Sequence, residues 1–289
     1  LAASDSSTPA VFEGHIERDW WLSSFSALTR HVGHSAHSAP DRDEQEENLI
    51  LPEEQPLRYR LTKGAEAGNL LHDTLEHCDF TDPDYRDLFV KTQERYSSLC
   101  ELFDEAEFTQ WLQEILHTTI GTQSLAQFTM QKTLRESEFY FPMRGSHINR
   151  LSEFISQRRG EPYQLPDRHK LKGMMHGFID LIFEMDGRFY VADYKSTHLG
   201  FGFNDYDKTQ MQHSIFSSSY DVQYAIYALA LHRYLKTRIK DYQPEQHFGG
   251  VYYLYLRGMH PEHNRGVFFD TFSGDELTTL DDIFNAQLE

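Results

Sequence analysis

The most informative hydrophobic pattern in the chain lies at residues 177–195, GFIDLIFEMDGRFYVADYK. Two largely apolar runs flank an Asp-Gly dipeptide, which between such runs is a strong signal for a β-hairpin. In a hairpin that turns at Asp186-Gly187, Asp180 and Asp193 each lie six positions from the turn. We therefore predict that these two aspartates face each other, with β-carbons about 5 Å apart.

Further elements are predicted on both sides of this hairpin. Helical periodicity occurs in residues 64–77, twice within 84–119, in 203–218, in 221–238 and in 275–288. Residues 136–143 and the aromatic-rich 248–257 predict strands. Strands near the centre of the chain with helices around them favour an α/β fold, in which helices cover a mixed β-sheet.

The N-terminal region predicts less regular structure. Residues 18–30 suit an ordered entry segment, whereas residues 31–56 are polar and acidic, which predicts a mobile linker or surface loop. We see no internal repeat and expect residues 1–289 to form a single domain. The chain starts with neither an initiator methionine nor a signal peptide, so we expect it to be a fragment of a longer chain.

The predicted hairpin suggests metal chemistry. Two facing carboxylates repel each other, and a divalent cation such as Mg²⁺ is the usual compensation. Side chains alternate along a strand, so Lys195 lies on the face of Asp193 and adds a positive charge suited to a phosphate or an attacking water. The apolar neighbours on this face partly desolvate the site; they are Phe178, Ile182, Phe189 and Val191. The alternative is a solvated hairpin with its charges on the outer face.

Composition narrows the classes of function. The net charge of −18, from 45 acidic and 27 basic residues, argues against a free-standing nucleic-acid binder. A basic stretch precedes the hairpin and is either a DNA contact or a solvated loop; it contains Arg158, Arg159, Arg168, Lys170 and Lys172. No apolar run approaches the roughly 20 residues of a membrane-spanning helix. The two cysteines, Cys78 and Cys100, suggest no disulfide framework, and a reducing cytoplasm is expected.

These motifs resemble those of a known family. Asp180 followed by Asp193-Tyr194-Lys195 is similar to the D…(D/E)xK signature of the restriction-endonuclease-like nuclease superfamily. The segments around it resemble the RecB-type nuclease domains of bacterial helicase–nucleases; they are GFIDLIF, ADYKSTHLG, YDVQYAIYALALHRYL, HFGGVYYLYLRG and KGAEAGNLLH. The resemblance implies a restriction-endonuclease-like α/β fold and a deoxyribonuclease, exonucleolytic or endonucleolytic, that uses Mg²⁺ or Mn²⁺.

The resemblance also implies roles for particular residues. Its metal ligands match His72, Asp180, Asp193 and the carbonyl of Tyr194, and its catalytic lysine matches Lys195. Its acidic residue on an earlier strand matches Glu138, and its QxxxY pattern matches Gln223 and Tyr227.

Three of these assignments have alternatives. His72 is one of 16 histidines, so the alternative for it is a structural role without a metal. Glu138 suits a solvent-facing strand position, with Glu136 as its neighbour on the same face. Gln223 and Tyr227 lie one helical turn apart, so they suit a polar pair within the core.

The family further implies partners. They are single-stranded DNA, a helicase part of the same chain and subunits like RecC and RecD, in the bacterial cytoplasm, for double-strand-break repair and degradation of foreign DNA. The chain has no GxxxxGK[ST] phosphate loop, so no nucleotide site of that type is expected. Two other hypotheses are a nuclease-fold module that docks or holds DNA without cutting it, and an enzyme for a small phosphate ester.

Overall fold

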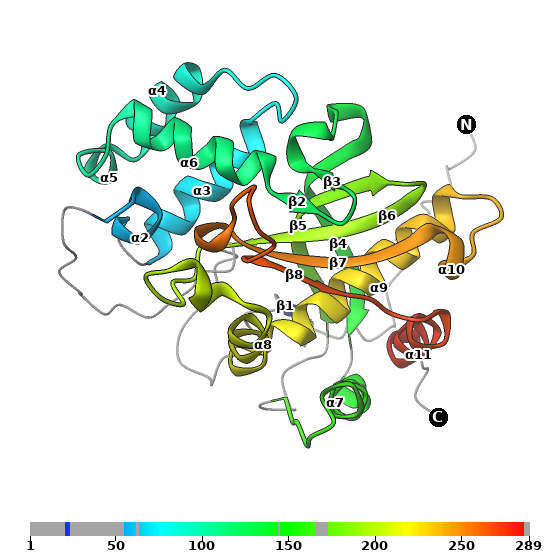
Figure 1. Cartoon of the computed structure of the whole chain (residues 1–289). Helices are drawn as coiled ribbons and strands as arrows, with labels where there is room; N and C mark the ends of the chain where they lie inside the picture. The colour runs from blue at the N-terminus through cyan, green and yellow to red at the C-terminus, as the bar shows by residue number, and fades with distance from the viewer. Residues whose placement is uncertain (1–20, 24–54, 62–63, 144, 166–172, 286–289) are drawn as a thin grey trace, which may run out of the picture.

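The computed structural model describes residues 21–23, 55–61, 64–143, 145–165 and 173–285. These residues form a six-stranded mixed β-sheet that is covered by helices on both faces (Figure 1). The predicted α/β architecture is therefore confirmed. None of the helices in the described part is long and apolar enough to cross a membrane.

The central sheet is built around the predicted hairpin. Its strands are β1 (Trp21–Ser23), β4 (Thr133–Met143), β5 (Gly173–Met185), β6 (Arg188–Lys195), β7 (Phe248–Tyr255) and β8 (Val267–Asp270). Strand β5 pairs antiparallel with β4 and β6 and parallel with β1. Strand β6 pairs parallel with β7, and β8 is antiparallel to β7 at the edge. A parallel pair needs a long crossover, and the segment between β6 and β7 contains three α-helices.

The turn of the β5–β6 hairpin has the expected chemistry. Asp186 has a φ of 53° and Gly187 a φ of 75°, as a two-residue turn with left-handed central residues requires. The ladder then runs from Met185↔Arg188 to Leu181↔Ala192. This register is the predicted one, and it brings Asp180 and Asp193 to the positions just beyond its last pair.

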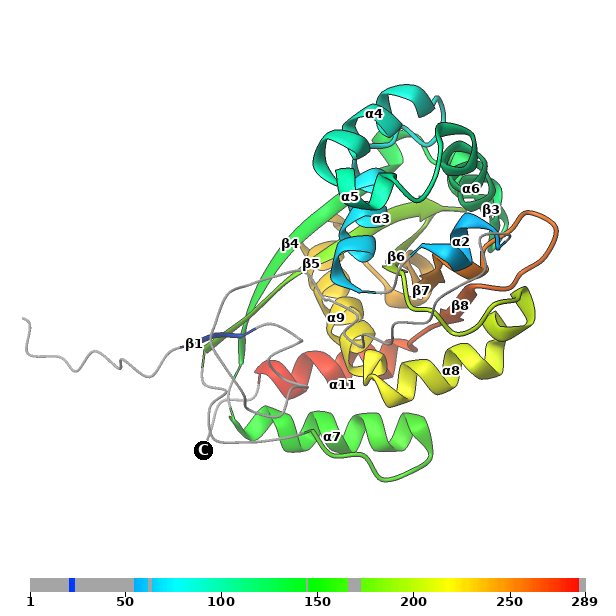
Figure 2. The same cartoon turned by 90° about the vertical axis from the view of Figure 1, so that its left-hand side faces the viewer.

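Helices separate onto the two faces of the sheet (Figures 1 and 2). One face carries α2 (Leu57–Arg60), α3 (Ala65–His77), α4 (Tyr85–Arg95), α5 (Ser97–Cys100) and α6 (Glu105–His117), which share one buried cluster. The other face carries α7 (Gly145–Arg159), α8 (Lys208–Ser217), α9 (Tyr220–Arg238) and α11 (Gly274–Asn285), which share the second. The sheet therefore separates two hydrophobic cores.

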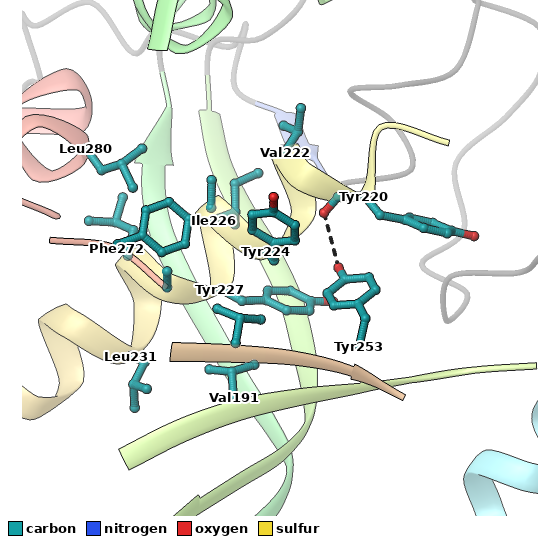
Figure 3. Packing of buried hydrophobic residues seen from close by; sticks show 14 of the residues in the cluster. Val191, Tyr220, Val222, Tyr224, Ile226, Tyr227, Leu231, Tyr253, Phe272 and Leu280 are labelled. Atoms are coloured by element: carbon teal, nitrogen blue, oxygen red, sulfur yellow. Dashed lines mark hydrogen bonds between the residues drawn. The ribbon is translucent and has the colours of Figure 1, made fainter. Parts of the chain in front are cut away.

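Helix α9 is apolar on nearly every side, and such a helix is expected to be buried. It packs between the sheet and α11, in contact with β6 and β7 (Figure 3). Tyr224 and Ile226 lie in the core, and Tyr253 of β7 donates a hydrogen bond of 3.3 Å to the carbonyl of Tyr220. The N-terminal turn of α9 is thus fastened to the strand beside β6.

All the predicted helices are present, but several elements were missed. They are α2, α5, α7, α10 (Pro244–His247), β1, β8 and the small hairpin of β2 (Thr119–Ile120) and β3 (Gln123–Ser124). These elements are short, or they have a weak hydrophobic pattern that sequence periodicity does not separate from a loop. Most of the predicted loop 31–56 lies outside the described residues, as does most of the entry segment.

The basic stretch divides in two. Arg158 pairs with Asp270 and Glu276, and Arg159 pairs with Asp221. These arginines join α7 to neighbouring elements, so they do not belong to a solvated loop. The remaining basic residues of the stretch, Arg168, Lys170 and Lys172, lie outside the described part.

Candidate functional site

The site begins at a break in the pairing of β4 with β5. The pairs on both sides keep one register, but Glu136 has a left-handed φ of 45° and does not pair regularly with Asp180. On one side of the break, Leu181 packs in the core beneath α3; on the other side, Ile179 packs in the core of α9. In a regular strand Ile179 and Leu181 would lie on the same face of the sheet, so the alternation of side chains is interrupted here. Such local backbone strain costs about 1–3 kcal/mol and is concentrated at functional sites.

His72 of α3 lies next to this break. Its Nδ1 is 3.4 Å from Asp180 Oδ1. One potential ligand atom from each of His72, Glu136 and Asp180 lies within 4.8 Å of the others, and among the described residues no other such group of histidine, cysteine and acidic side chains is found. Imidazole and carboxylate groups at this separation fit a divalent cation. We call these three residues the ligand group.

The charges of the ligand group favour a cation. Burial, and next the charge of Asp180, raise the pKa of Glu136 to about 7. Burial by itself lowers the pKa of His72, but the neighbouring Asp180 carboxylate outweighs it and raises that pKa to about 9. Without a metal, a protonated His72 compensates the acidic groups. A bound divalent cation would take over that role.

The backbone of β6 orients Asp180. The N–H of Tyr194 donates a hydrogen bond of 2.6 Å to Asp180 Oδ2, while the other carboxylate oxygen faces His72. The ring of Tyr194 packs edge-on against His72, with 5.7 Å between ring centroids. Asp180 therefore links the hairpin to α3.

Asp193 and Lys195 form a buried ion pair beside the ligand group. Asp193 Oδ2 lies 3.0 Å from Lys195 Nζ, and both residues are 3% exposed. Burial raises the pKa of Asp193, and the charge of Lys195 partly offsets this effect. Asp193 does not belong to the ligand group, but its charge acts on His72 and Asp180.

Helix α9 and β7 surround the ammonium group of Lys195. Gln223 Oε1 accepts a hydrogen bond of 3.2 Å from Lys195 Nζ and one of 2.5 Å from the hydroxyl of Tyr253. Gln223 Nε2 donates to the hydroxyl of Tyr227 at 3.1 Å. The ammonium also lies 3.7 Å from the ring centroid of Tyr220 and 5.2 Å from that of Tyr253, within cation–π range.

Sequence reasoning missed Tyr220 and Tyr253. Their contacts with Lys195 join β6, β7 and α9, which are distant in the sequence, so no local pattern indicated them. The family resemblance implies Gln223 and Tyr227, and the structure brings Gln223 into direct contact with Lys195.

The structure does not bring Glu138 to the ligand group; Glu136 lies there instead. Glu138 has a side chain that is 46% exposed, and it accepts hydrogen bonds from His176 Nε2 at 2.9 Å and the hydroxyl of Tyr140 at 2.5 Å. The sequence analysis assumed regular alternation along the strand and so placed both glutamates on one face. The break at Glu136 interrupts that alternation, and only Glu136 reaches the ligand group.

Gly68 has a packing role. A β-carbon on Gly68 would lie 3.1 Å from Ser196 Oγ, so a larger residue would require that hydroxyl to move by a few tenths of an ångström. Gly68 thus lets α3 approach the sheet closely, one turn before His72.

Comparison with known proteins identifies the family of the chain. A family model of the PD-(D/E)XK nuclease superfamily matches residues 44–289. The chain is 32% identical to the "RecBCD enzyme subunit RecB" of Haemophilus influenzae, over 97% of this chain and 25% of that protein. It is 33% identical to the protein of the same name from Escherichia coli, over 92% of this chain and 23% of that protein.

The chain thus spans about a quarter of the length of the curated relatives it matches. The matched residues include α3, β4, the β5–β6 hairpin, α9 and β7, which together carry the ligand group and the residues around Lys195. The sheet has the mixed topology expected for the resemblance. On this evidence, the chain belongs to the PD-(D/E)XK nuclease superfamily.

Proposed function

We propose that this chain is a metal-dependent deoxyribonuclease domain that hydrolyses phosphodiester bonds in DNA. The observation that carries the proposal is the placement of the ligand group beside the buried pair of Asp193 and Lys195. A metal-dependent nuclease uses a cation to bind the scissile phosphate and benefits from a further positive group near the reacting oxygens. The residues that meet both requirements lie on three adjacent strands, β4, β5 and β6, and on one helix, α3.

His72, Glu136 and Asp180 would hold the cation, with Asp193 and the carbonyl of Tyr194 as further candidates from the family resemblance. Mg²⁺ suits the carboxylate oxygens, and Mn²⁺ tolerates the imidazole as well. When bound, the cation stabilises negative charge on the phosphate and lowers the pKa of a bound water. Asp180 remains oriented by the Tyr194 N–H throughout.

Lys195 would donate hydrogen bonds to the attacking water or to a non-bridging phosphate oxygen. Asp193, Gln223 and the ring of Tyr220 hold its ammonium in place. A preorganised donor of this kind acts without reorganisation when the reaction occurs. Gln223 and Tyr227 would therefore be positioning residues.

The substrate we propose is single-stranded DNA that a helicase delivers. The net charge of −18 opposes unaided capture of a polyanion. The relatives are named as subunits of the RecBCD enzyme, and this chain matches only about a quarter of their length. We therefore propose that the domain acts in the bacterial cytoplasm with a helicase part of its own chain and with subunits like RecC and RecD, in double-strand-break repair and degradation of foreign DNA.

Cleavage of an end-labelled single-stranded oligonucleotide tests the proposal. We expect cutting with Mg²⁺, none with a chelator, and loss of cutting in Asp193→Ala and Asp180→Asn variants. Asp241→Asn, at an exposed position after α9, is the matched control and should cut normally. If the isolated chain is inactive, the same variants are compared within a helicase assembly. If all variants cut equally in that assembly, or if none of them cuts, the chain is instead a module that docks or holds DNA without cutting it.

A further inference from the structure

Three aromatic rings lie together on β4 and β5, close to the ligand group. The ring of Tyr140 stacks on His176, with 4.5 Å between centroids and 15° between planes. Phe178 packs edge-to-face against the ring of His176, with 5.0 Å between the centroids. We call Tyr140, His176 and Phe178 the aromatic patch.

The aromatic patch combines exposure with fixed orientation. Tyr140 is 52% exposed and Phe178 is 41% exposed, whereas His176 between them is buried. Glu138 accepts hydrogen bonds from both the Tyr140 hydroxyl and His176 Nε2, so it fixes the two stacked rings relative to each other. Exposed aromatic rings held in one arrangement suggest a binding surface.

The patch lies on the same side of the sheet as His72. Phe139 and Met175 pack toward the core of α9, so their neighbours Tyr140 and His176 point to the opposite face, the one that carries α3. Figure 2 shows β4 and β5 continuing beyond α3, which leaves that part of the face uncovered by α3.

The patch is also continuous with the ligand group along the strands. Glu138 and Phe178 are register partners, and each is two residues from a ligand, Glu136 or Asp180. Two residues of strand span about 7 Å. A nucleotide whose phosphate lies at the ligand group would therefore have a neighbouring base within reach of Phe178.

We propose that the aromatic patch stacks bases of the single DNA strand next to the scissile phosphate. This inference rests on the proposed function. Every base has a π-face, so stacking on aromatic rings binds single strands with little sequence preference. The Glu138 carboxylate beside the rings repels phosphate groups, which favours contact through the bases over contact through the backbone. Glu138 then serves as a positioning residue for the patch.

Fluorescence anisotropy with the full chain tests this idea. The probes are a labelled oligothymidylate and an abasic strand of equal length, both in EDTA to prevent hydrolysis. We expect Tyr140→Ala and Phe178→Ala to weaken binding of the oligothymidylate by roughly 5- to 100-fold each, with little effect on the abasic strand. Tyr140→Phe keeps the ring but loses the hydrogen bond to Glu138, so it should weaken binding less than Tyr140→Ala does. Tyr234→Ala, which removes a tyrosine of 38% exposure from α9, is the matched control.

Equal binding of the two probes by the wild type, or unchanged binding of oligothymidylate by both alanine variants, would overturn the proposal. A photocrosslink from 5-iodouracil placed next to the cleavage position gives a second measurement. We expect the crosslinked peptide to contain Tyr140 or Phe178; crosslinks confined to other segments would contradict stacking at this patch.

The two proposals fail in different ways. If the wild type cuts with Mg²⁺ but the patch variants bind normally, the nuclease proposal stands and the stacking proposal is wrong. If the patch variants lose base-dependent binding but the wild type never cuts, in isolation or in a helicase assembly, the patch is a strand-binding site and the nuclease proposal is wrong.

Discussion

Lys195 Nζ lies 3.0 Å from Asp193 Oδ2, in a pair that is almost completely shielded from water. The two residues are neighbours on one face of β6, and helix α9 covers them. Burying two opposite charges together is costly, but leaving one of them alone is costlier. Removing one charge of the pair should therefore lower stability, and removing Lys195 should also lower catalysis.

Replacing Lys195 by methionine should reduce both properties. We expect cleavage to fall by roughly 100-fold or more, because a donor aimed at the reacting oxygens is lost. The free energy of unfolding should fall by about 3–5 kcal/mol, since Asp193 stays buried without its partner. Urea unfolding and initial cleavage rates measure the two effects.

The double variant Asp193→Asn/Lys195→Met separates them. It removes both charges and should recover much of the stability but none of the cleavage. A double variant as unstable as Lys195→Met would show that the charge pair is not the source of the loss.

Glu136 and Glu138 should differ in metal binding. Glu136→Gln removes one carboxylate of the ligand group. Loss of a group that only supports a metal ligand lowers metal affinity by roughly 10- to 100-fold, so we expect the Mn²⁺ affinity of this variant to fall at least as much. Glu138→Gln should bind Mn²⁺ like the wild type, because Glu138 contacts only Tyr140 and His176 among the contacts described. Titration calorimetry measures both affinities. A larger loss from Glu138→Gln would refute our assignment of the ligand group.

Tyr253→Phe tests how Lys195 is positioned. The change removes the hydroxyl that contacts Gln223 Oε1 at 2.5 Å and the carbonyl of Tyr220 at 3.3 Å, but it keeps the ring near the ammonium group. We expect kcat to fall about tenfold with KM nearly unchanged, and the free energy of unfolding to fall by about 1 kcal/mol. Tyr220→Phe, which retains its ring over Lys195, is the control and should leave kcat close to wild type. A rise in KM without a change in kcat would instead indicate a role in substrate binding.

The two cysteines should be unreactive in the folded chain. Cys78 and Cys100 are free and buried, and burial raises the pKa of both thiols, to about 12 for Cys78. Because the thiolate is the reactive form, a disulfide reagent at pH 8 should modify neither cysteine until the chain is unfolded, when both should react. Rapid modification of native protein would show that the core around α3 to α6 opens readily.

Local chemistry determined the hairpin and with it half of the site. The Asp-Gly turn sets the register of β5 against β6, and strand alternation then places Lys195 with Asp193. The periodic helices α3 and α6 were likewise predictable, because their hydrophobic spacing extends over several turns. Knowledge of the family added His72, Gln223 and Tyr227, whose importance no local pattern indicates.

Tertiary structure alone decided the rest. The choice of Glu136 over Glu138 depends on a left-handed residue in β4, and regular alternation cannot anticipate such a residue. The enclosure of Lys195 by Tyr220 and Tyr253 requires α9 to pack across β6 and β7. Local periodicity specifies which side of an element is apolar, but not which distant element covers it. That choice arises from the packing of the whole core, and here it sets the environment of the charged groups.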